Sequence, residues 1–251
     1  MHQTLVTIIT ATFNSAKTVA DTMRSVEKQD YPLIEHIVVD GLSTDDTLKI
    51  VQSFPHLSHF ISEHDDGIYD AMNKGIREST GDIIGILNSD DVYANTTVIS
   101  RIAEAFSDSS VQACYSDLQY MDALEGASVK RTWKSKQHTS NSFHWGWMPP
   151  HPTFFVRKQV YDKVGLFKTS LQTAADYEMM LRVLVKHRMK AVYVPGVMVK
   201  MRSGGISNAS VKNRIRANRE DREAWRMNDL KPYFFTLYLK PLRKIMQFLK
   251  K

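Results

Sequence analysis

Cysteine is nearly absent from this sequence, whose 251 residues include only Cys114. A lone cysteine excludes an intrachain disulfide framework, so we expect a reducing compartment, the cytoplasm. Glycine and proline are also sparse, with 11 and 8 residues, which excludes collagen-like and low-complexity chains. The composition, 43% hydrophobic and 24% charged, is that of a globular protein with one large domain, or one domain and an appendage.

Long apolar runs are missing as well. No stretch approaches the roughly 20 apolar residues of a membrane-spanning helix. The mostly apolar residues 5–11 form a short stretch without a basic flank, so we expect no signal peptide.

Basic residues are concentrated at one end of the chain, whose formal net charge is +6. Residues 1–211 hold 21 Lys/Arg and 23 Asp/Glu, whereas residues 212–251 hold 12 Lys/Arg and 4 Asp/Glu. A slightly acidic body is not typical of nucleic-acid binding, so we expect no nucleic-acid partner. The basic tail needs an explanation of its own.

Strand-like and helix-like segments alternate through the first 120 residues. This alternation predicts an α/β fold with a doubly wound, mainly parallel sheet. Ligands bind such sheets beyond the carboxyl ends of the strands, which selects residues 10–14, 40–44, 65–69 and 88–91. The expected strands are 5–10, 34–40, 60–62, 82–87 and 111–116, and the expected helices are 15–29, 43–53, 68–77 and 96–106.

The second half is less regular. A strand at 153–156 and helices at 157–164 and 175–187 are expected, followed by strands at 191–194 and 197–201 that Pro195 and Gly196 separate. A basic helix at 211–227 and an aromatic segment from Tyr233 follow. We therefore divide the chain into a domain at 1–210, with a nucleotide-binding half at 1–117 and an acceptor half at 118–210, and a helical amphipathic tail at 211–251.

Two adjacent carboxylates, Asp90 and Asp91, directly follow the apolar run 83–87. Carboxylates at a strand end can hold Mg²⁺ or Mn²⁺, which needs only one or two of them when phosphates and water complete the shell. A turn is the alternative, because Asn, Ser and Asp all form turns readily.

A third carboxylate, Asp40, also ends an expected strand and precedes a helix. It can accept a hydrogen bond from a nucleobase N–H. Helix capping by Ser43 or Thr44 explains the polar residues that follow, and it explains Asp45 and Asp46, but it leaves Asp40 unexplained.

Five motifs occur in one order along the chain: TATFN at 10–14, VVDGLSTDDT at 38–47, DDGIYDAMNKGI at 65–76, TGDIIGILNSDD at 80–91 and AADYEMMLR at 174–182. In this order they resemble family 2 glycosyltransferases of the GT-A fold, in particular bacterial members that build polysaccharides and lipid-linked glycans. The resemblance covers residues 4–208, and the combination is more specific than any single motif.

The resemblance implies a role for each matching residue. Asp91, aided by Asp90, corresponds to the acidic motif whose divalent cation, Mn²⁺ or Mg²⁺, bridges the diphosphate of the donor. Asp176 corresponds to the catalytic base. The residues implied to bind the nucleotide are Thr10, Thr12, Asp40, Asp66, Asn73 and Asp90.

Two positions depart from the family pattern. Many relatives have Arg where this chain has Met72, and Glu where it has Ala175. Neutralisation of the diphosphate then depends on the metal and on other cations, for which we consider Lys74, Arg202 and His151.

The expected chemistry is consistent with this set of residues. Transfer from a nucleotide-sugar needs an electrophilic clamp on the leaving diphosphate and a base for the acceptor hydroxyl. Inversion requires one base and no covalent nucleophile. Asp176 is our candidate, with Glu178 in reserve; the alternative for Asp176 is a carboxylate that stabilises the first turn of a helix.

The segment from Trp145 to Pro152 is rich in aromatic residues and proline. Trp145 and Trp147 can stack on sugar rings or form an apolar lip for a lipid-linked acceptor. A hydrophobic plug over the core is the alternative for one of them. His151 can reach the diphosphate or form a polar contact within the loop. The glycines of 203–207 resemble the family's loop that folds over the donor.

Aromatic and basic residues interleave in the tail from 233 to 249. This pattern favours a segment that lies on an anionic membrane, since about 1 kcal/mol of binding comes from each basic residue near such a surface. A helix that packs on the body or on a second subunit is the alternative.

The sequence thus predicts an inverting, metal-dependent glycosyltransferase at the inner face of the cell membrane. It would move sugar from a nucleotide-sugar, for which we expect UDP, to a glycan or polyprenyl-linked acceptor in cell-surface polysaccharide synthesis. Two alternatives stay open. A nucleotidyltransferase acting on sugar phosphates would have a Gly-rich loop after the first strand, and a non-catalytic nucleotide-binding protein would lack Asp90, Asp91 or Asp176.

Overall fold

A computed structural model of the chain describes residues 4–122, 128–202 and 211–249. For residues 211–215 and 244–249 it describes the backbone alone. The predicted glycine loop at 203–207 lies outside the described residues.

One nine-stranded sheet runs through the molecule in the order β3-β2-β1-β4-β8-β6-β9-β5, with β7 paired to β6. The strands are β1 (Val6–Thr12), β2 (Ile34–Asp40), β3 (Leu57–Ser62), β4 (Ile83–Ile86), β5 (Asp91–Tyr93), β6 (Ala113–Met121), β7 (Val129–Trp133), β8 (Phe155–Arg157) and β9 (Ala191–Arg202).

The helical segments connect these strands. They are α1 (Val19–Glu27), α2 (Thr47–Gln52), α3 (Ile68–Glu78), α4 (Val98–Ala105), η1 (Phe143–Trp145), η2 (His151–Thr153), α5 (Lys158–Val164), α6 (Ala175–Leu181), η3 (Arg182–Lys186), α7 (Val211–Met227) and α8 (Thr236–Leu249).

The first four strands of this order, β3-β2-β1-β4, are parallel, which confirms the predicted doubly wound α/β arrangement. Thr12 pairs with Asp40 across β1 and β2, so the polar residues that end these two strands meet at one edge. In the second half β6 and β9 are parallel, whereas β8, β5 and β7 run antiparallel to their neighbours.

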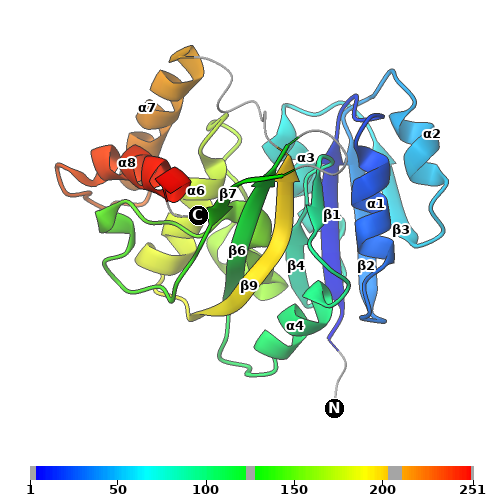
Figure 1. Ribbon diagram of the computed structural model, residues 1–251, viewed down its shortest axis with the longest axis horizontal. Coiled ribbons are helices and arrows are strands. Elements are labelled where there is room, and N and C mark those ends of the chain that lie inside the picture. Colours follow the sequence, from blue (N-terminus) through cyan, green and yellow to red (C-terminus); the bar gives the residue numbers. More distant parts are fainter. Residues whose placement is uncertain (1–3, 123–127, 203–210, 250–251) are drawn as a thin grey trace.

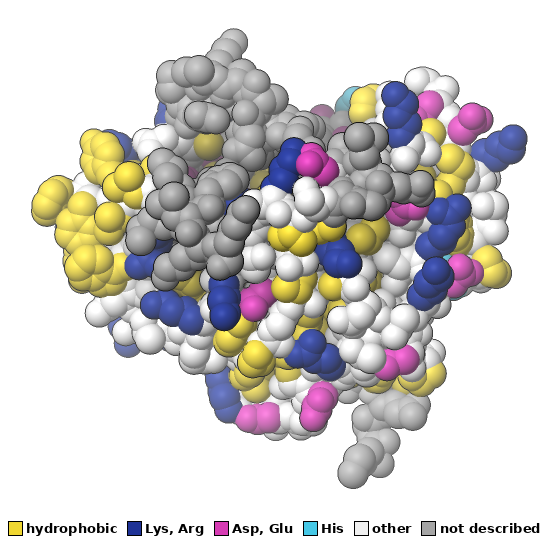
Figure 2. Space-filling model, viewed as in Figure 1, with side chains coloured by type: hydrophobic (Ala, Val, Ile, Leu, Met, Phe, Trp, Pro, Cys, Tyr) yellow, Lys and Arg dark blue, Asp and Glu magenta, His cyan; other side chains and the backbone are white. Residues whose placement is uncertain are grey.

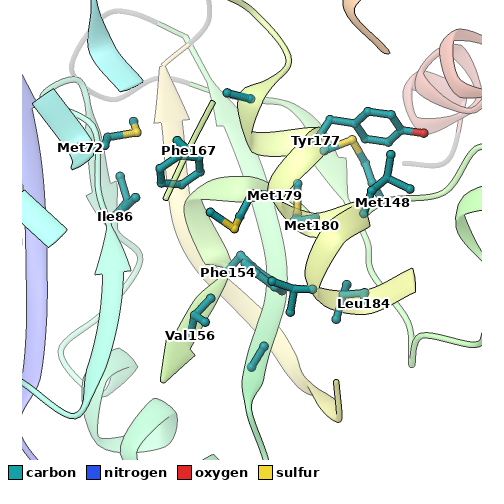
Figure 3. Packing of buried hydrophobic residues seen from close by; sticks show 14 of the residues in the cluster. Met72, Ile86, Met148, Phe154, Val156, Phe167, Tyr177, Met179, Met180 and Leu184 are labelled. Atoms are coloured by element: carbon teal, nitrogen blue, oxygen red, sulfur yellow. The ribbon is translucent and has the colours of Figure 1, made fainter. Parts of the chain in front are cut away.

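Helices cover both faces of the sheet. Figure 1 shows α1 and α4 in front of the sheet and α3 behind it. Because successive strand residues point to opposite faces, Ile8 packs with the α1 and α4 residues, and Ile9 packs with α3, α5 and α6. Figure 3 shows the second of these clusters, with Phe154 and Val156 beside Met179 of α6.

Three strands differ from the expectation. β5 and β7 were not predicted, because each is short and lacks a regular alternation of apolar and polar residues. β9 continues through Pro195 and Gly196, where the register with β6 shifts and Gly196 has a φ of 104°. A proline at a bulge costs no ladder hydrogen bond, so the strand is bent there without being interrupted.

The tail packs on the second half of the body. The Trp225 indole is buried and donates a hydrogen bond to the Tyr177 hydroxyl over 2.9 Å. The Thr236 hydroxyl donates a hydrogen bond to the His144 carbonyl. Gly146 lies against the backbone of Leu239, so closely that a Cβ at position 146 would come within 2.8 Å of the Leu239 carbonyl carbon. In Figure 1, α7 and α8 lie together beside α6. This is the alternative that the sequence left open for the tail.

No helix in the described part of the chain is long and apolar enough to cross a bilayer.

Candidate active site

Thr10, at the carboxyl end of β1, points into the protein. Its side chain is buried, and its hydroxyl lies 3.0 Å from Nε2 of His36. Nδ1 of His36 lies 3.0 Å from Nε2 of His56, whose other nitrogen lies 3.8 Å from the Glu27 carboxylate. Burial and the neighbouring His56 lower the pKa of His36 to about 3, so the His36 imidazole is uncharged at neutral pH. Contact between Thr10 and a nucleoside stays a prediction.

Asp40, at the end of β2, is buried and accepts four hydrogen bonds. Its Oδ1 accepts from the hydroxyls of Thr12 (2.9 Å) and Ser43 (2.5 Å). Its Oδ2 accepts from the Ser43 amide (2.8 Å) and the Ser62 hydroxyl (3.0 Å). Two carboxylate oxygens offer about four lone-pair sites, so a nucleobase N–H would have to displace one of these hydroxyls.

The DDGIYDAMNKGI motif contributes residues in different environments. Asp66 is exposed before α3, whereas Asn73 is buried within it. The Asn73 amide donates to the Phe167 carbonyl (3.0 Å) and accepts from the Phe167 amide (2.9 Å). Asn73 therefore joins α3 to the loop before α6, and its nucleotide contact stays a prediction. Lys74 forms an ion pair with Glu63 over 2.9 Å.

The predicted metal-binding carboxylates lie where β5 begins. Asp91 is fully buried, and its Oδ2 accepts a hydrogen bond from the Asn88 amide over 3.3 Å. Oδ1 of Asp91 and Oδ1 of Asn88 are buried with no hydrogen-bond partner among the described residues. Burial, followed by the charge of Asp90, raises the pKa of Asp91 well above its usual value. One carboxylate oxygen of Asp91 and the amide oxygen of Asn88, both buried and both without a donor in the described part of the chain, fit a site for a divalent cation.

Asp90 and Asp91 would fill only part of the coordination shell of a divalent cation, and other ligands would fill the rest. Within the described residues, no three His, Cys, Asp or Glu side chains gather as a metal site. Burial also raises the pKa of Asp90, which the Arg202 charge partly offsets. Arg202 is ion-paired with Asp21, and its charge also opposes the increase that burial causes in the pKa of both Asp90 and Asp91; its contact with a diphosphate stays a prediction.

Asp176, in the first turn of α6, is half-buried and held from two sides. Its Oδ1 accepts a hydrogen bond from the Tyr177 amide (2.8 Å) and another from the Tyr69 hydroxyl (3.3 Å). The Tyr69 ring lies 5.7 Å from the Phe167 ring, and His151 meets Phe167 edge to face at 5.7 Å. Burial lowers the pKa of His151 and the Asp176 charge opposes this, so His151 lies close to the predicted base.

Tyr120 connects the two groups of carboxylates. Burial raises the pKa of its hydroxyl, and both Asp91 and Asp176 add to the increase. The Arg131 guanidinium lies 3.8 Å from the centre of this ring. Asp91 and Tyr120 also pair with the same residue of β9, Met201, from its two sides. The charges of the predicted metal site and of the predicted base therefore both act on Tyr120, although 85 residues separate Asp91 from Asp176 in the sequence.

Glu178, the reserve candidate for the base, is part of the core. It forms a buried ion pair with Arg182 over 2.7 Å and accepts a hydrogen bond from Asn228 of the tail over 3.0 Å. Arg182 also donates to the carbonyls of Val164 and Leu166. Glu178 therefore holds α6 on its neighbours through a buried ion pair, and Asp176 stays our candidate for the base.

The two tryptophans have different environments. Trp147 is buried and packs against Tyr115, His138 and Phe143, so it is the hydrophobic plug that the sequence offered as an alternative for one of them. Trp145 is half exposed and lies 5.1 Å from Phe235 of the tail.

A hollow of about 400 Å³ opens next to α6. Residues 170–172 form one wall, and Arg216, Arg219, Glu220 and Glu223 of α7 form the other. Glu220 accepts two hydrogen bonds from Thr173, and its charge adds to the raised pKa of Tyr69. The hollow thus lies beside the segment that leads into α6, whose first turn carries Asp176.

Comparison with known proteins decides the family. The protein-family model described as glycosyl transferase family 2 matches residues 7–165 of this chain. The chain belongs to glycosyl transferase family 2. It is therefore a glycosyltransferase, as the motifs predicted, and neither a nucleotidyltransferase nor a non-catalytic binding protein.

Two relatives illustrate this membership. An uncharacterised glycosyltransferase of Mycobacterium tuberculosis is 32% identical over 187 residues, which cover 70% of this chain and 68% of the relative. A glycosyltransferase of PGL/p-HBAD biosynthesis from Mycobacterium bovis is 26% identical over 227 residues, covering 84% of this chain and 82% of the relative.

Solved structures confirm the GT-A fold. Staphylococcus aureus TarS 1–349, in complex with UDP-GlcNAc, superposes with a TM-score of 0.71 at 19% identity. The match covers 89% of this glycosyltransferase and 65% of the TarS fragment, so this chain spans less than two thirds of it. The mannosyltransferase PcManGT of Pyrobaculum calidifontis, in complex with GDP-Man and Mn²⁺, has a TM-score of 0.66 at 20% identity, covering 96% and 70% of the two chains.

Three residues of this glycosyltransferase's site were not predicted. Tyr69 lies within a recognised motif but was not singled out, although its place in the motif was a usable signal. Tyr120 and Phe167 lie in segments without any motif, and only tertiary contacts bring them to Asp176 and Asp91.

Proposed function

We propose that this glycosyltransferase inverts the anomeric configuration of a sugar that it transfers from a nucleotide-sugar, most simply a UDP-sugar, to a glycan or lipid-linked acceptor in cell-surface polysaccharide synthesis. The observation that carries the proposal is the Asp176 carboxylate in the first turn of α6, which accepts hydrogen bonds from the Tyr69 hydroxyl and the Tyr177 amide. A relative that acts in PGL/p-HBAD biosynthesis and a TarS fragment that binds UDP-GlcNAc support the assignment of donor and pathway class.

In this proposal Asp176 is the base. The acceptor hydroxyl gives its proton to the Asp176 carboxylate while its oxygen forms a bond to the anomeric carbon. The bond from this carbon to the diphosphate oxygen breaks, and the leaving diphosphate takes the electron pair. One displacement inverts the configuration, and it needs no covalent nucleophile.

The hollow beside α6 is our proposed entrance for the acceptor. Its walls carry donors and acceptors of hydrogen bonds, among them Gln172, Arg216 and Glu220, which suit the hydroxyls of a sugar. Thr173, which donates two hydrogen bonds to Glu220 of this hollow, lies three residues before Asp176, so an acceptor in the hollow would approach the base at the start of α6.

Asp91, with Asp90, would hold the divalent cation. Mn²⁺ or Mg²⁺ would neutralise charge that develops on the leaving diphosphate. Arg202 lies on this side of the site and would supply a further positive charge. Thr12, Asp40 and Asp66 would contact the nucleoside from the ends of β1 and β2 and the start of α3.

We also propose a cytoplasmic location at the inner face of the cell membrane, where a polyprenyl-linked acceptor would be found. The basic, aromatic tail supports peripheral contact with an anionic membrane.

A panel of nucleotide-sugars in thermal unfolding, with and without Mn²⁺, tests the proposal. One donor with metal should raise the melting temperature, because a ligand that binds only the native state stabilises it by mass action. NMR of the transfer product should then show the anomeric configuration opposite to that of the donor. No shift with any nucleotide-sugar in the presence of metal, or retained configuration, would overturn the proposal.

A further inference from the structure

Large apolar side chains are exposed together at one end of the molecule. Figure 2 shows hydrophobic side chains gathered at its left edge, where Figure 1 places α8 and the loop before it. Phe234 is 89% exposed and Tyr238 is 65% exposed. We call this set the aromatic face: Trp145, Tyr233, Phe234, Tyr238 and Leu242.

The aromatic face is one continuous surface. Phe235 lies beneath it, with ring centres 5.1 Å from Trp145, 5.4 Å from Tyr233 and 5.1 Å from Phe234. Tyr238 and Leu242 are four residues apart on α8 and so lie on one side of the helix. Arg243 donates a hydrogen bond to the Trp145 carbonyl over 2.7 Å, which joins α8 to η1.

The segment that carries most of this face has charge of a single sign, although Lys240 is ion-paired with Asp221 of α7 on the inner side of the helix. Residues 230–251 contain six Lys or Arg and no Asp or Glu. A second copy of the chain would bring two such segments together, which electrostatic repulsion disfavours. Exposed aromatic rings next to basic side chains match the boundary of an anionic bilayer, where rings enter the headgroup region and the cations remain at the phosphates.

We propose that the aromatic face docks this glycosyltransferase on an anionic lipid bilayer. The proposal extends the proposed function, because it assigns membrane contact to one surface and relates that surface to the base. The whole segment 233–249 was expected to lie on the membrane, but the inner side of α8 packs on the body, as α7 also does.

The inner side of α8 is attached to the helix that carries the base. Lys240 forms an ion pair with Asp221 over 2.6 Å, and its ammonium lies 3.6 Å from the centre of the Tyr177 ring, next to Asp176. Docking through the outer side of the same helix would therefore hold α6 at a fixed depth relative to the lipid. A lipid-linked acceptor would reach the hollow beside α6 from that surface.

Sedimentation of the full chain with vesicles tests the docking. The vesicles contain phosphatidylglycerol and phosphatidylcholine, or phosphatidylcholine alone. The wild-type chain should sediment with the anionic vesicles, and raising NaCl from about 0.05 to about 0.5 M should weaken this binding by screening. The triple variant F234S/Y238S/L242S should bind the anionic vesicles about tenfold less tightly, or worse.

The matched control is F13S/L42S, which removes Phe13 (63% exposed) and Leu42 (50% exposed) from another part of the surface. It should bind vesicles as the wild type does. The proposal would be overturned if the triple variant bound anionic vesicles as tightly as the wild type, or if the control lost as much binding as the triple variant. Wild-type binding to neutral vesicles as tight as to anionic vesicles would also overturn it. Dimerisation through the aromatic face without vesicle binding, measured by light scattering, would also overturn it.

Activity distinguishes this proposal from the proposed function. Transfer to a water-soluble acceptor in the absence of vesicles should be the same in the triple variant and the wild type, since none of the three residues lies near Asp176. A chain that binds vesicles but transfers no sugar would refute the function and leave the docking intact.

Discussion

Tyr69 of α3 donates its hydroxyl hydrogen to the Asp176 carboxylate of α6 across 3.3 Å. The two residues are 107 positions apart, one in the predicted nucleotide-binding half and one in the predicted acceptor half. Burial and the Asp176 charge raise the pKa of Tyr69 well above its usual value, so the hydroxyl keeps its proton and remains a donor. The predicted base is thus oriented by a residue of the half that would hold the donor.

Replacing Asp176 tests its role as the base. Asp176→Asn keeps the shape and the hydrogen bond from Tyr69 but cannot accept the acceptor's proton, so we expect the turnover rate to fall by about 10²–10⁴-fold. Donor binding, measured by titration calorimetry, should be unchanged. Near-wild-type turnover would contradict the assignment.

Glu178→Gln is the matched control for that variant. It weakens the buried ion pair with Arg182, so we expect a lower melting temperature and retained turnover by the folded protein. A loss of turnover as large as that of Asp176→Asn, in folded protein, would return Glu178 to consideration as the base.

Removing the Asp91 charge should separate metal binding from stability. Without metal, Asp91 is a buried carboxylate with one oxygen that lacks a donor, so Asp91→Asn should raise the melting temperature of the metal-free protein. With Mn²⁺ present, the wild type should be stabilised and the variant should not. Asp46→Asn, at an exposed position, should respond to Mn²⁺ as the wild type does; equal stabilisation of Asp91→Asn would contradict the metal site.

His36 should make the protein sensitive to acid. Its pKa is lowered to about 3 in the native state, so below about pH 6.5 the unfolded state binds a proton that the native state does not. This contribution to stability is present at neutral pH and is lost as the pH falls, by about 2 kcal/mol between about pH 6.5 and 5.

Urea unfolding at these two pH values measures the loss. His36→Gln should reduce the difference in unfolding free energy between them, whereas His59→Gln, at an exposed position of β3, should leave it unchanged. An unchanged pH dependence in His36→Gln would show that other groups cause the sensitivity.

Lys240 should stabilise the body through the tail. Burial raises the pKa of Asp221 and the Lys240 charge opposes this, so Lys240→Met leaves Asp221 buried without its cation. We expect a loss of about 3 kcal/mol in the free energy of unfolding. Lys186→Met removes the corresponding partner of the exposed Asp229 and should cost less than about 1 kcal/mol. Equal effects in the two variants would mean that the tail is not part of the folded unit.

Much of the fold was predictable because it depends on local patterns. The predicted helix at 68–77 agrees with α3, and the strand 34–40 agrees with β2, since apolar spacing determines both. β5 could not be predicted, because Asp91 begins a three-residue strand that forms only by pairing with β9. The same pairing buries Asp91, whose carboxylate would be exposed if residues 88–91 formed a surface turn.

Candidate residues were also predictable by type, but their orientation was not. Asn73 and Trp147 belong to segments that the sequence singled out, yet Asn73 is bonded to the Phe167 backbone and Trp147 lies in the core. Neither the motif nor the spacing could tell whether an amide faces a ligand or another loop, because the loop at Phe167 comes about 90 residues later.

The sequence by itself determined the family, the order of strands and helices along the chain, and the carboxylates at the strand ends, because motifs and periodicity are local. Only the tertiary structure decided the partners of these carboxylates. Asp91 and Tyr120 pair with Met201 through distant strands, and Asp176 binds the Tyr69 hydroxyl through the packing of α6 against α3. The tertiary structure also decided the position of the tail. Trp225 binds Tyr177 of α6 and Lys240 binds Asp221 of α7, and no local pattern specifies these partners.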